Sequence, residues 1–269
     1  MLGNKNPFKG RQFTAEIILW AVRWYLQFPI SYRDLECMLS DRGVQVDHTT
    51  LFRWIQAYAP EIEKRIRPHL RMTNGSWRVD ETYIRVKGKW VYLYRAVDAA
   101  GQTIDFLLSP KRDAAAARRF FRKALGQPHT VNPRIITVDK NAAYPIAVKA
   151  MKRARELWRF AKASDGLSDP LGSHLCPGER GRTSRIRLFV RCSKLRQVKF
   201  LNNIVEQDHR RIKRLVHPGL GFKSFATASQ TIAGYEAMAM IRKGQVARAP
   251  ASDMGALRDF IAALFGTAA

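Results

Sequence analysis

The chain has 269 residues, 46% of them hydrophobic, which is typical of a globular protein with one or two packed cores. Its 47 Lys and Arg residues outnumber its 22 Asp and Glu residues, so the net charge is +25. This excess favours a nucleic-acid partner, because basic side chains displace counterions from phosphates, although a ribosomal or membrane-surface protein can be similarly basic. The three cysteines give no disulfide framework, and no apolar run could span a bilayer. We therefore expect a cytoplasmic protein without a membrane partner.

Three helices are predicted within residues 1–60. Apolar residues at helical spacing predict the first over residues 14–27. Ser31 begins a capping-box pattern ahead of the second helix, which Gly43 ends, and Asp47 can cap the third. A short turn between the last two helices is typical of the helix-turn-helix, which places its last helix in the DNA major groove. The alternative is a small helical bundle that does not contact DNA.

The third helix carries the side chains that we expect to contact DNA. Its solvent-facing residues, all able to reach base edges or phosphates, are predicted to be Thr49, Thr50, Arg53 and Gln56. Cys37, in the second helix, is expected to be a buried thiol and not a metal ligand.

A basic linker over residues 61–76 separates this unit from a second domain, residues 77–245, and residues 246–269 form a tail with an amphipathic helix. Strands are predicted at 79–86, 91–97, 103–108, 135–138 and 196–200, and helices at 112–125, 142–157, 203–216 and 226–243. This order predicts a mixed sheet with helices on its faces, an α/β fold preceded by an all-α domain.

Three acids occupy positions that suggest chemistry. Asp80 lies inside an apolar, β-branched strand, where Asp is normally disfavoured. Asp139 closes the apolar fourth strand, which we expect to pair beside the first, and Glu206 begins a helix rich in basic residues. Three converging carboxylates without a cation would repel each other and raise their pKa values. The pattern therefore indicates a site for two Mg²⁺ ions that serves phosphoryl transfer.

Other acids lie close to this pattern in the sequence. Glu81 is expected to point to the opposite face of the strand from Asp80, because strand side chains alternate, and is not predicted to bind metal. Asp98 and Asp105 flank a turn and are expected on the surface.

The helix that carries Glu206 has a polar face shared by His209, Arg210 and Lys213, at helical spacing. Here Glu206 would hold metal, while Lys213, about two turns further on, would meet DNA phosphate. The alternative is a solvated salt bridge between Glu206 and Arg210, four residues apart.

Taken together, these segments closely resemble the DDE transposases of the bacterial insertion sequence 6 family. The matching stretches are NPFKGR (6–11), IILWAVRWY (17–25), VDHTTLFRW (46–54), VDETY (79–83), YLYRAVD (92–98), TVDK (137–140), NNIVEQDH (202–209), GLGFKS (219–224) and RKGQ (242–245). They cover most of residues 6 to 245, and their joint pattern is very specific.

This resemblance implies an RNase H-like catalytic domain in which Asp80, Asp139 and Glu206 are the catalytic and metal-binding triad, with Mg²⁺ replaceable by Mn²⁺. It also implies binding to terminal inverted repeats, strand transfer into target DNA, and a homodimer or larger assembly on the nucleoid. Arg210 and Lys213 are expected to bind DNA, since Lys213 matches a basic residue that the family places two helical turns after the glutamate.

One segment departs from the family pattern. Sixty-six residues separate Asp139 from Glu206, more than family members have, and the excess lies at about 158–191. We interpret it as a loop insertion or as the scar of a frameshift. His174, Cys176 and Cys192 could suggest zinc, but their irregular spacing makes this a weak hypothesis.

Two functions follow from these features. The first is a transposase that cuts element ends and joins their 3′-hydroxyls to target DNA without a covalent protein–DNA intermediate. The second is a DNA-binding regulator derived from such a transposase, in which the insertion has disabled the chemistry.

Overall fold

The structure, a computed structural model, describes residues 7–154, 156–161, 189–198, 203–247 and 253–267. Its α-helices are α1 (Ala15–Gln27), α2 (Tyr32–Ser40), α3 (His48–Ile66), α4 (Ala114–Leu125), α5 (Ala143–Arg153), α6 (Asn203–Val216), α7 (Phe225–Arg242) and α8 (Met254–Leu264). Its strands are β1 (Ser76–Val86), β2 (Lys89–Asp98), β3 (Thr103–Ser109), β4 (Ile135–Val138), β5 (Trp158–Ala161), β6 (Phe189–Cys192) and β7 (Lys194–Gln197). Short 3₁₀ turns follow α3 and α6.

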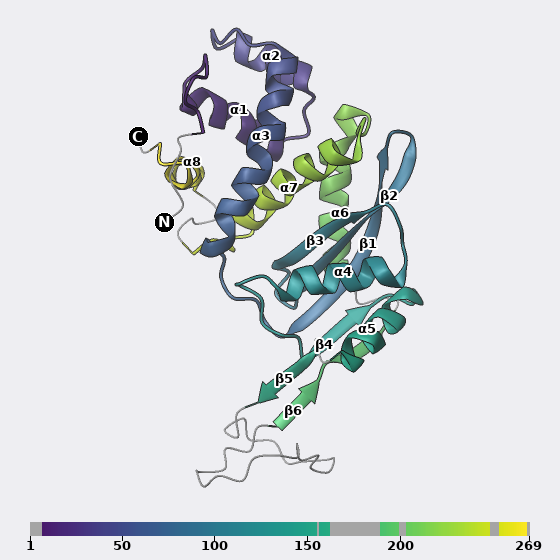
Figure 1. Cartoon of the computed structure of the whole chain (residues 1–269). Coiled ribbons are helices and arrows are strands. Elements are labelled where there is room, and N and C mark those ends of the chain that lie inside the picture. The colour runs from purple at the N-terminus through teal and green to yellow at the C-terminus, as the bar shows by residue number, and fades with distance from the viewer. Residues whose placement is uncertain (1–6, 155, 162–188, 199–202, 248–252, 268–269) are drawn as a thin grey trace.

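A five-stranded mixed sheet forms the centre of the molecule, in the order β3-β2-β1-β4-β7 (Figure 1). The first three strands form an antiparallel meander, while β4 runs parallel to β1 and β7 runs parallel to β4. The predicted mixed sheet, with the fourth strand beside the first, is therefore confirmed. Pairing between β1 and β4 ends at Val79 and Val138, and near its far end β1 is bridged at Val86 by Phe222, from the segment after α6.

The alternation of side chains along β1 gives the sheet two buried faces. Trp77 and Val79 pack into a core with α4 and α5, which cover the front of the sheet in Figure 1. Ile84 and Val86 point to the other face and join a larger core that contains α6 and α7. Because helices cover both faces, the acids of β1 lie within reach of helices on either side.

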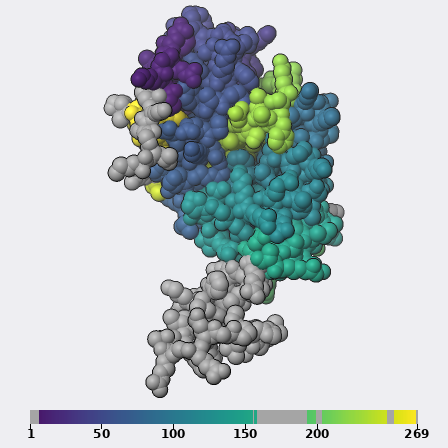
Figure 2. All heavy atoms as spheres, in the orientation of Figure 1, coloured from purple at the N-terminus to yellow at the C-terminus, as the bar shows by residue number. Residues whose placement is uncertain are grey.

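The larger core also holds the N-terminal helices. Helix α7 packs against α1 and α3, and α8 packs against the same two helices. In Figure 2 the yellow-green surface of α7 lies between the blue surface of α3 and the sheet. The expected tail helix therefore stabilises the N-terminal unit. In the part of the chain that the structure describes, no helix has the length and apolar character to cross a bilayer.

Several predicted boundaries are wrong. Helix α3 continues through Pro60 to Ile66, into the stretch expected as a linker. The strand expected at 196–200 is β7, Lys194–Gln197, and the helix expected to reach residue 157 ends at Arg153. The antiparallel pair of strands β5 and β6 was not predicted, and it lies at the two ends of the segment expected as an insertion, whose residues 162–188 lie outside the described chain.

The contact between α7 and the N-terminal helices depends on Gly234. A Cβ atom there would lie 2.6 Å from Ala59 Cβ and 2.7 Å from Leu26 Cδ2, so Gly234→Ala is expected to destabilise the fold by about 1–3 kcal/mol through overpacking. Urea unfolding would measure this loss. Gly219→Ala is the control, because open space surrounds Gly219. Equal stability of the two variants would contradict the close approach of α7 and α3.

Candidate metal site at the ends of β1 and β4

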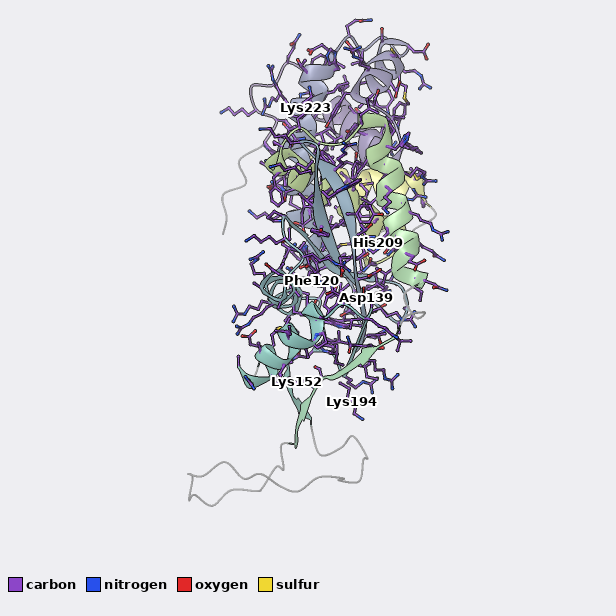
Figure 3. All side chains as sticks on the ribbon, turned by 90° about the vertical axis from the view of Figure 1, so that its right-hand side faces the viewer. Phe120, Asp139, Lys152, Lys194, His209 and Lys223 are labelled. Carbon is purple, nitrogen blue, oxygen red and sulfur yellow. The ribbon has the colours of Figure 1, made fainter. Side chains whose placement is uncertain are left out.

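Asp80 and Asp139 directly follow the last paired residues of two parallel strands, Val79 and Val138. Since the strands run in the same direction, both carboxylates emerge at the same edge of the sheet. Carboxylate oxygens of Asp80, Asp139 and Glu81 lie within 4.8 Å of one another. In Figure 3 the labelled Asp139 lies beside the lower end of α6, close to the labelled His209. This edge of the sheet is the candidate functional site.

Glu81 reaches the site from the opposite face of β1. Its side chain is only 2% exposed, and Oε1 accepts a hydrogen bond of 3.0 Å from Asn141 Nδ2. The Tyr144 hydroxyl and the Arg112 guanidinium also donate to Glu81. Arg112 Nη2 lies 3.6 Å from Asp139 Oδ2 as well. The predicted alternation is confirmed, but it does not keep Glu81 away from the other two carboxylates.

Among the residues that the structure describes, no charged Lys or Arg side chain pairs with the Asp80 carboxylate. Burial first, and then the negative charges of Glu81, Asp139 and Glu206, together raise its pKa to about 7. The nearest basic group within the described residues is His209, whose Nδ1 lies 3.8 Å from Asp80 Oδ2. Burial, with the charges of Arg95 and Lys213, lowers the pKa of His209 to about 3, so the imidazole is neutral.

These carboxylates fit a divalent metal ion. Hard cations such as Mg²⁺ and Mn²⁺ prefer carboxylate oxygens, and a bound cation would offset the repulsion among the acids. The Asp139 side chain is held in place, because its Oδ1 accepts the Asn141 backbone N–H at 3.0 Å.

Glu206 lies in the first turn of α6 and is exposed. It is outside the group of three oxygens, yet close enough for its charge to raise the pKa of Asp80. Neither Glu206 nor Arg210 takes part in an ion pair with a described residue, so the alternative salt bridge is not formed. His209, expected on the same polar face, is buried instead against Asp80.

A buried cluster of charges fixes α6 against the sheet. Arg95 of β2, 1% exposed, has Nη1 at 3.5 Å from Asp208 Oδ2 and also ion-pairs with Glu236 of α7. Lys243, just after α7, ion-pairs with Asp208 and donates to the Gly101 carbonyl at 2.9 Å. Since Asp208 is two residues from Glu206, this cluster sets where Glu206 can lie. Sequence reasoning missed it because its members are far apart in the chain.

Asp98 and Asp105, which were expected on the surface, are buried and have structural roles, so that expectation is wrong. Asp98 is 2% exposed and accepts backbone N–H groups of Asn74, Ala100 and Gln102. Asp105 is fully buried and is paired with Arg67 at 2.8 Å and Lys123 at 3.1 Å. Their oxygens are thus occupied by protein donors, which disfavours a role in metal binding.

The residues expected to read DNA differ in their surroundings. Arg53 is exposed on α3. Thr49 and Thr50 both donate their hydroxyl groups to Asp47, the N-cap of the helix. Gln56 does not face solvent as expected, because its Nε2 donates to Thr231 Oγ1 of α7 at 3.0 Å.

The thiol predictions have mixed outcomes. Cys37 is exposed, so the expected burial is wrong. His174 and Cys176 lie outside the described residues, and Cys192 lies in β6, so the zinc hypothesis has no structural test.

Comparisons with known proteins identify the family. The DDE domain family matches residues 74–164 and 187–245. The transposase for insertion sequence-like element IS431mec of Staphylococcus aureus is 33% identical over 239 residues, which cover 88% of this chain and 89% of that protein.

The chain belongs to the DDE transposases of the insertion sequence 6 family. A second Staphylococcus aureus relative, the transposase for IS257 in transposon Tn4003, matches with the same identity and coverage. Among solved structures, the HTLV-2 integrase catalytic core domain in complex with magnesium (trimeric form) covers 61% of this chain and 84% of its own, with 15% identity and a TM-score of 0.37.

Family membership confirms that the protein is an enzyme, a polynucleotidyl transferase, and that its mixed sheet is an RNase H-like core. The family match leaves out residues 165–186, which lie within the segment expected as an insertion.

Proposed function

We propose that the protein binds the terminal inverted repeats of an insertion sequence and catalyses Mg²⁺-dependent strand cleavage and strand transfer. The observation that carries the proposal is the convergence of Asp80 and Asp139, which directly follow the last paired residues of two parallel strands, with no cationic partner for Asp80 among the described residues. In a member of this family, such a group of acids is best explained as the metal site of phosphoryl transfer.

Asp80, Asp139 and Glu206 would together hold two Mg²⁺ ions, for which Mn²⁺ can substitute. When bound, the ions supply Lewis-acid activation of the attacking hydroxyl and the leaving oxygen. Glu81 accepts hydrogen bonds from Tyr144, Asn141 and Arg112. Its role would be to position these three side chains at the edge of the site. Glu206 would complete the site from α6. The ion pairs of Asp208 with Arg95 and Lys243 hold this helix beside the sheet.

DNA contacts would come from two regions. Arg210 and Lys213 are exposed on α6 beyond Glu206 and would bind the phosphates of the reacting strand. In the N-terminal unit, Thr49, Thr50 and Arg53 near the start of α3 would contact the inverted repeat. Gln56 would instead help to hold α3 in place through its hydrogen bond to Thr231 of α7. We further propose that a dimer or larger assembly brings two element ends together on the bacterial nucleoid.

A strand-joining assay tests this proposal. Labelled element ends, incubated with a target plasmid and Mg²⁺, are expected to yield joined products that EDTA abolishes. A gel shift with the same ends runs in parallel. Binding without joining would instead favour a regulator, the second candidate, which the 165–186 segment outside the family match suggests.

Arg53 provides a test of end recognition. Arg53→Ala is expected to weaken binding to inverted-repeat DNA by about tenfold, because a base contact is worth about 1–3 kcal/mol, while binding to unrelated DNA changes less. Gel shifts on both DNAs measure this difference. Arg42→Ala, a substitution of another exposed arginine in the same unit, is the control. Equal losses on both DNAs would argue against base readout by Arg53.

A further inference from the structure

The half of the β1–β2 hairpin nearest its turn carries two aromatic side chains that are exposed to solvent. Tyr83 is 53% exposed and Trp90 is 57% exposed, and their rings meet edge-on with centroids 5.0 Å apart. With Tyr92 they line a shallow hollow of about 270 Å³. Large aromatic side chains are rarely left uncovered without a partner, so this pair requires an explanation.

Two basic side chains lie over these rings. The Arg85 guanidinium lies 5.9 Å from the centre of the Trp90 ring, and Lys213 Nζ of α6 lies 4.6 Å from that of Tyr83. Lys87 in the turn is exposed as well. We call Tyr83, Trp90, Arg85 and Lys213 the aromatic–basic platform. It combines flat apolar rings with positive charge, which is the combination that binds unpaired nucleotides through base stacking and phosphate contacts.

The platform is held rigidly to the helix that bears Glu206. After α6 the chain returns to β1, where the Phe222 N–H donates to the Arg85 carbonyl at 3.2 Å and the Lys87 N–H donates to the Phe222 carbonyl at 2.7 Å. Gly221 permits this approach, since its φ is +94° and a Cβ there would lie 3.0 Å from the Arg85 carbonyl oxygen. These two bonds connect the hairpin to the segment that follows α6.

The platform also lies near the metal site. Tyr83 is three residues beyond Asp80 on the same strand, a separation of about 10 Å at roughly 3.3 Å per residue. Because strand side chains alternate, Tyr83 lies on the same face of the sheet as Glu81. Tyr92 of β2 lies directly opposite Tyr83. A DNA strand that leaves the carboxylates along β1 would reach the rings within a few nucleotides.

We infer that the aromatic–basic platform binds unpaired bases of the DNA strand next to the scissile phosphate, with Tyr83 and Trp90 stacking on the bases. Charge favours DNA as the partner. Arg85 and Lys213 lie next to the aromatic rings, and the chain has a net charge of +25, so this surface suits a polyanion better than a second copy of the same basic chain. This inference rests on the proposed function, since it assumes that DNA occupies the site.

Trp90→Leu tests the inference on the full chain. The probes are a blunt duplex of the element end and the same duplex with an oligothymidylate overhang at the cleavage junction. Wild-type protein is expected to prefer the overhang duplex, and Trp90→Leu should lower that preference about tenfold while affinity for the blunt duplex stays within about twofold. Trp90→Phe should retain most of the preference, because the aromatic face remains. Phe28→Leu, at a residue of similar exposure on the N-terminal unit, should retain all of it.

Three results would overturn the inference. If Trp90→Leu left the preference intact and reduced only thermal stability, the ring pair would be a contact that stabilises the hairpin. If Trp90→Leu changed only the sedimentation coefficient of the protein and not its DNA preference, the surface would be a contact between copies of the chain. Wild-type binding to neither DNA would overturn the proposed function as well, whereas DNA binding without a Trp90-dependent preference would overturn the platform alone.

Discussion

Asp80→Asn and Asp139→Asn are each expected to lower the rate of strand joining by about a thousandfold or more, while gel-shift affinity for element ends stays close to that of the wild type. Each substitution removes one negative charge from a group of carboxylates with little change in shape. Losing the metal would remove several kcal/mol of transition-state stabilisation, which corresponds to this loss of rate. Asp259→Asn, at an exposed acid on α8, is the control and should join ends at the wild-type rate. Near-normal joining by Asp80→Asn would exclude it as a metal ligand.

Two further substitutions decide the composition of the ligand set. Glu206→Gln should match the loss seen for Asp80, even though Glu206 lies outside the group of three oxygens. Glu81→Gln should cost less, because Glu81 lies outside the proposed ligand set and the amide oxygen can still accept from Asn141 while its NH₂ group donates to the Tyr144 hydroxyl. The reverse order of losses would assign the third ligand to Glu81.

Arg95→Met is expected to destabilise the fold by about 3–5 kcal/mol. It leaves Glu236, which is fully buried, without its cationic partner, and an uncompensated buried charge is costly. Urea unfolding followed by circular dichroism would measure the loss. Strand joining should also fall, because Asp208 would no longer tie α6 to β2 near Glu206.

The double variant Arg95→Met with Glu236→Met is the matched control for this prediction. It removes both members of one pair and leaves Asp208 with Lys243, so most of the lost stability should return. If Arg95→Met alone cost less than about 1 kcal/mol, the buried Arg95–Glu236 pair would not be what holds α7 against β2.

Local patterns in the sequence predict much of the fold. Apolar spacing and caps give α1 to α3, and the apolar run before Asp139 gives a buried parallel strand. Boundaries fail where local signals conflict with packing. Pro60 indicates a helix end, yet α3 continues because Ile62 and Ile66 are buried in the larger core. β7 is largely exposed and lacks alternation, so its register is set by pairing with β4.

The site shows the same division between local and distant information. Asp80 and Asp139 can be brought together from sequence, because the strand that Asp139 closes is expected to pair beside the strand that contains Asp80. The burial of Asp105 could not be predicted, since its partner Arg67 is 38 residues away. His209 also lies on a polar stripe in sequence but is buried by the sheet. Charged residues are hard to place because their burial depends on partners that only the fold brings together.

Binding of Mn²⁺ in the presence of element-end DNA tests the central claim most directly. Titration followed by electron paramagnetic resonance counts the free and bound ion in wild-type protein and in Asp80→Asn and Asp139→Asn. We predict saturable binding by the wild type and a loss of at least about tenfold in affinity for each variant, because each removes a carboxylate ligand. Equal Mn²⁺ affinity in all three proteins would contradict a metal site at the ends of β1 and β4.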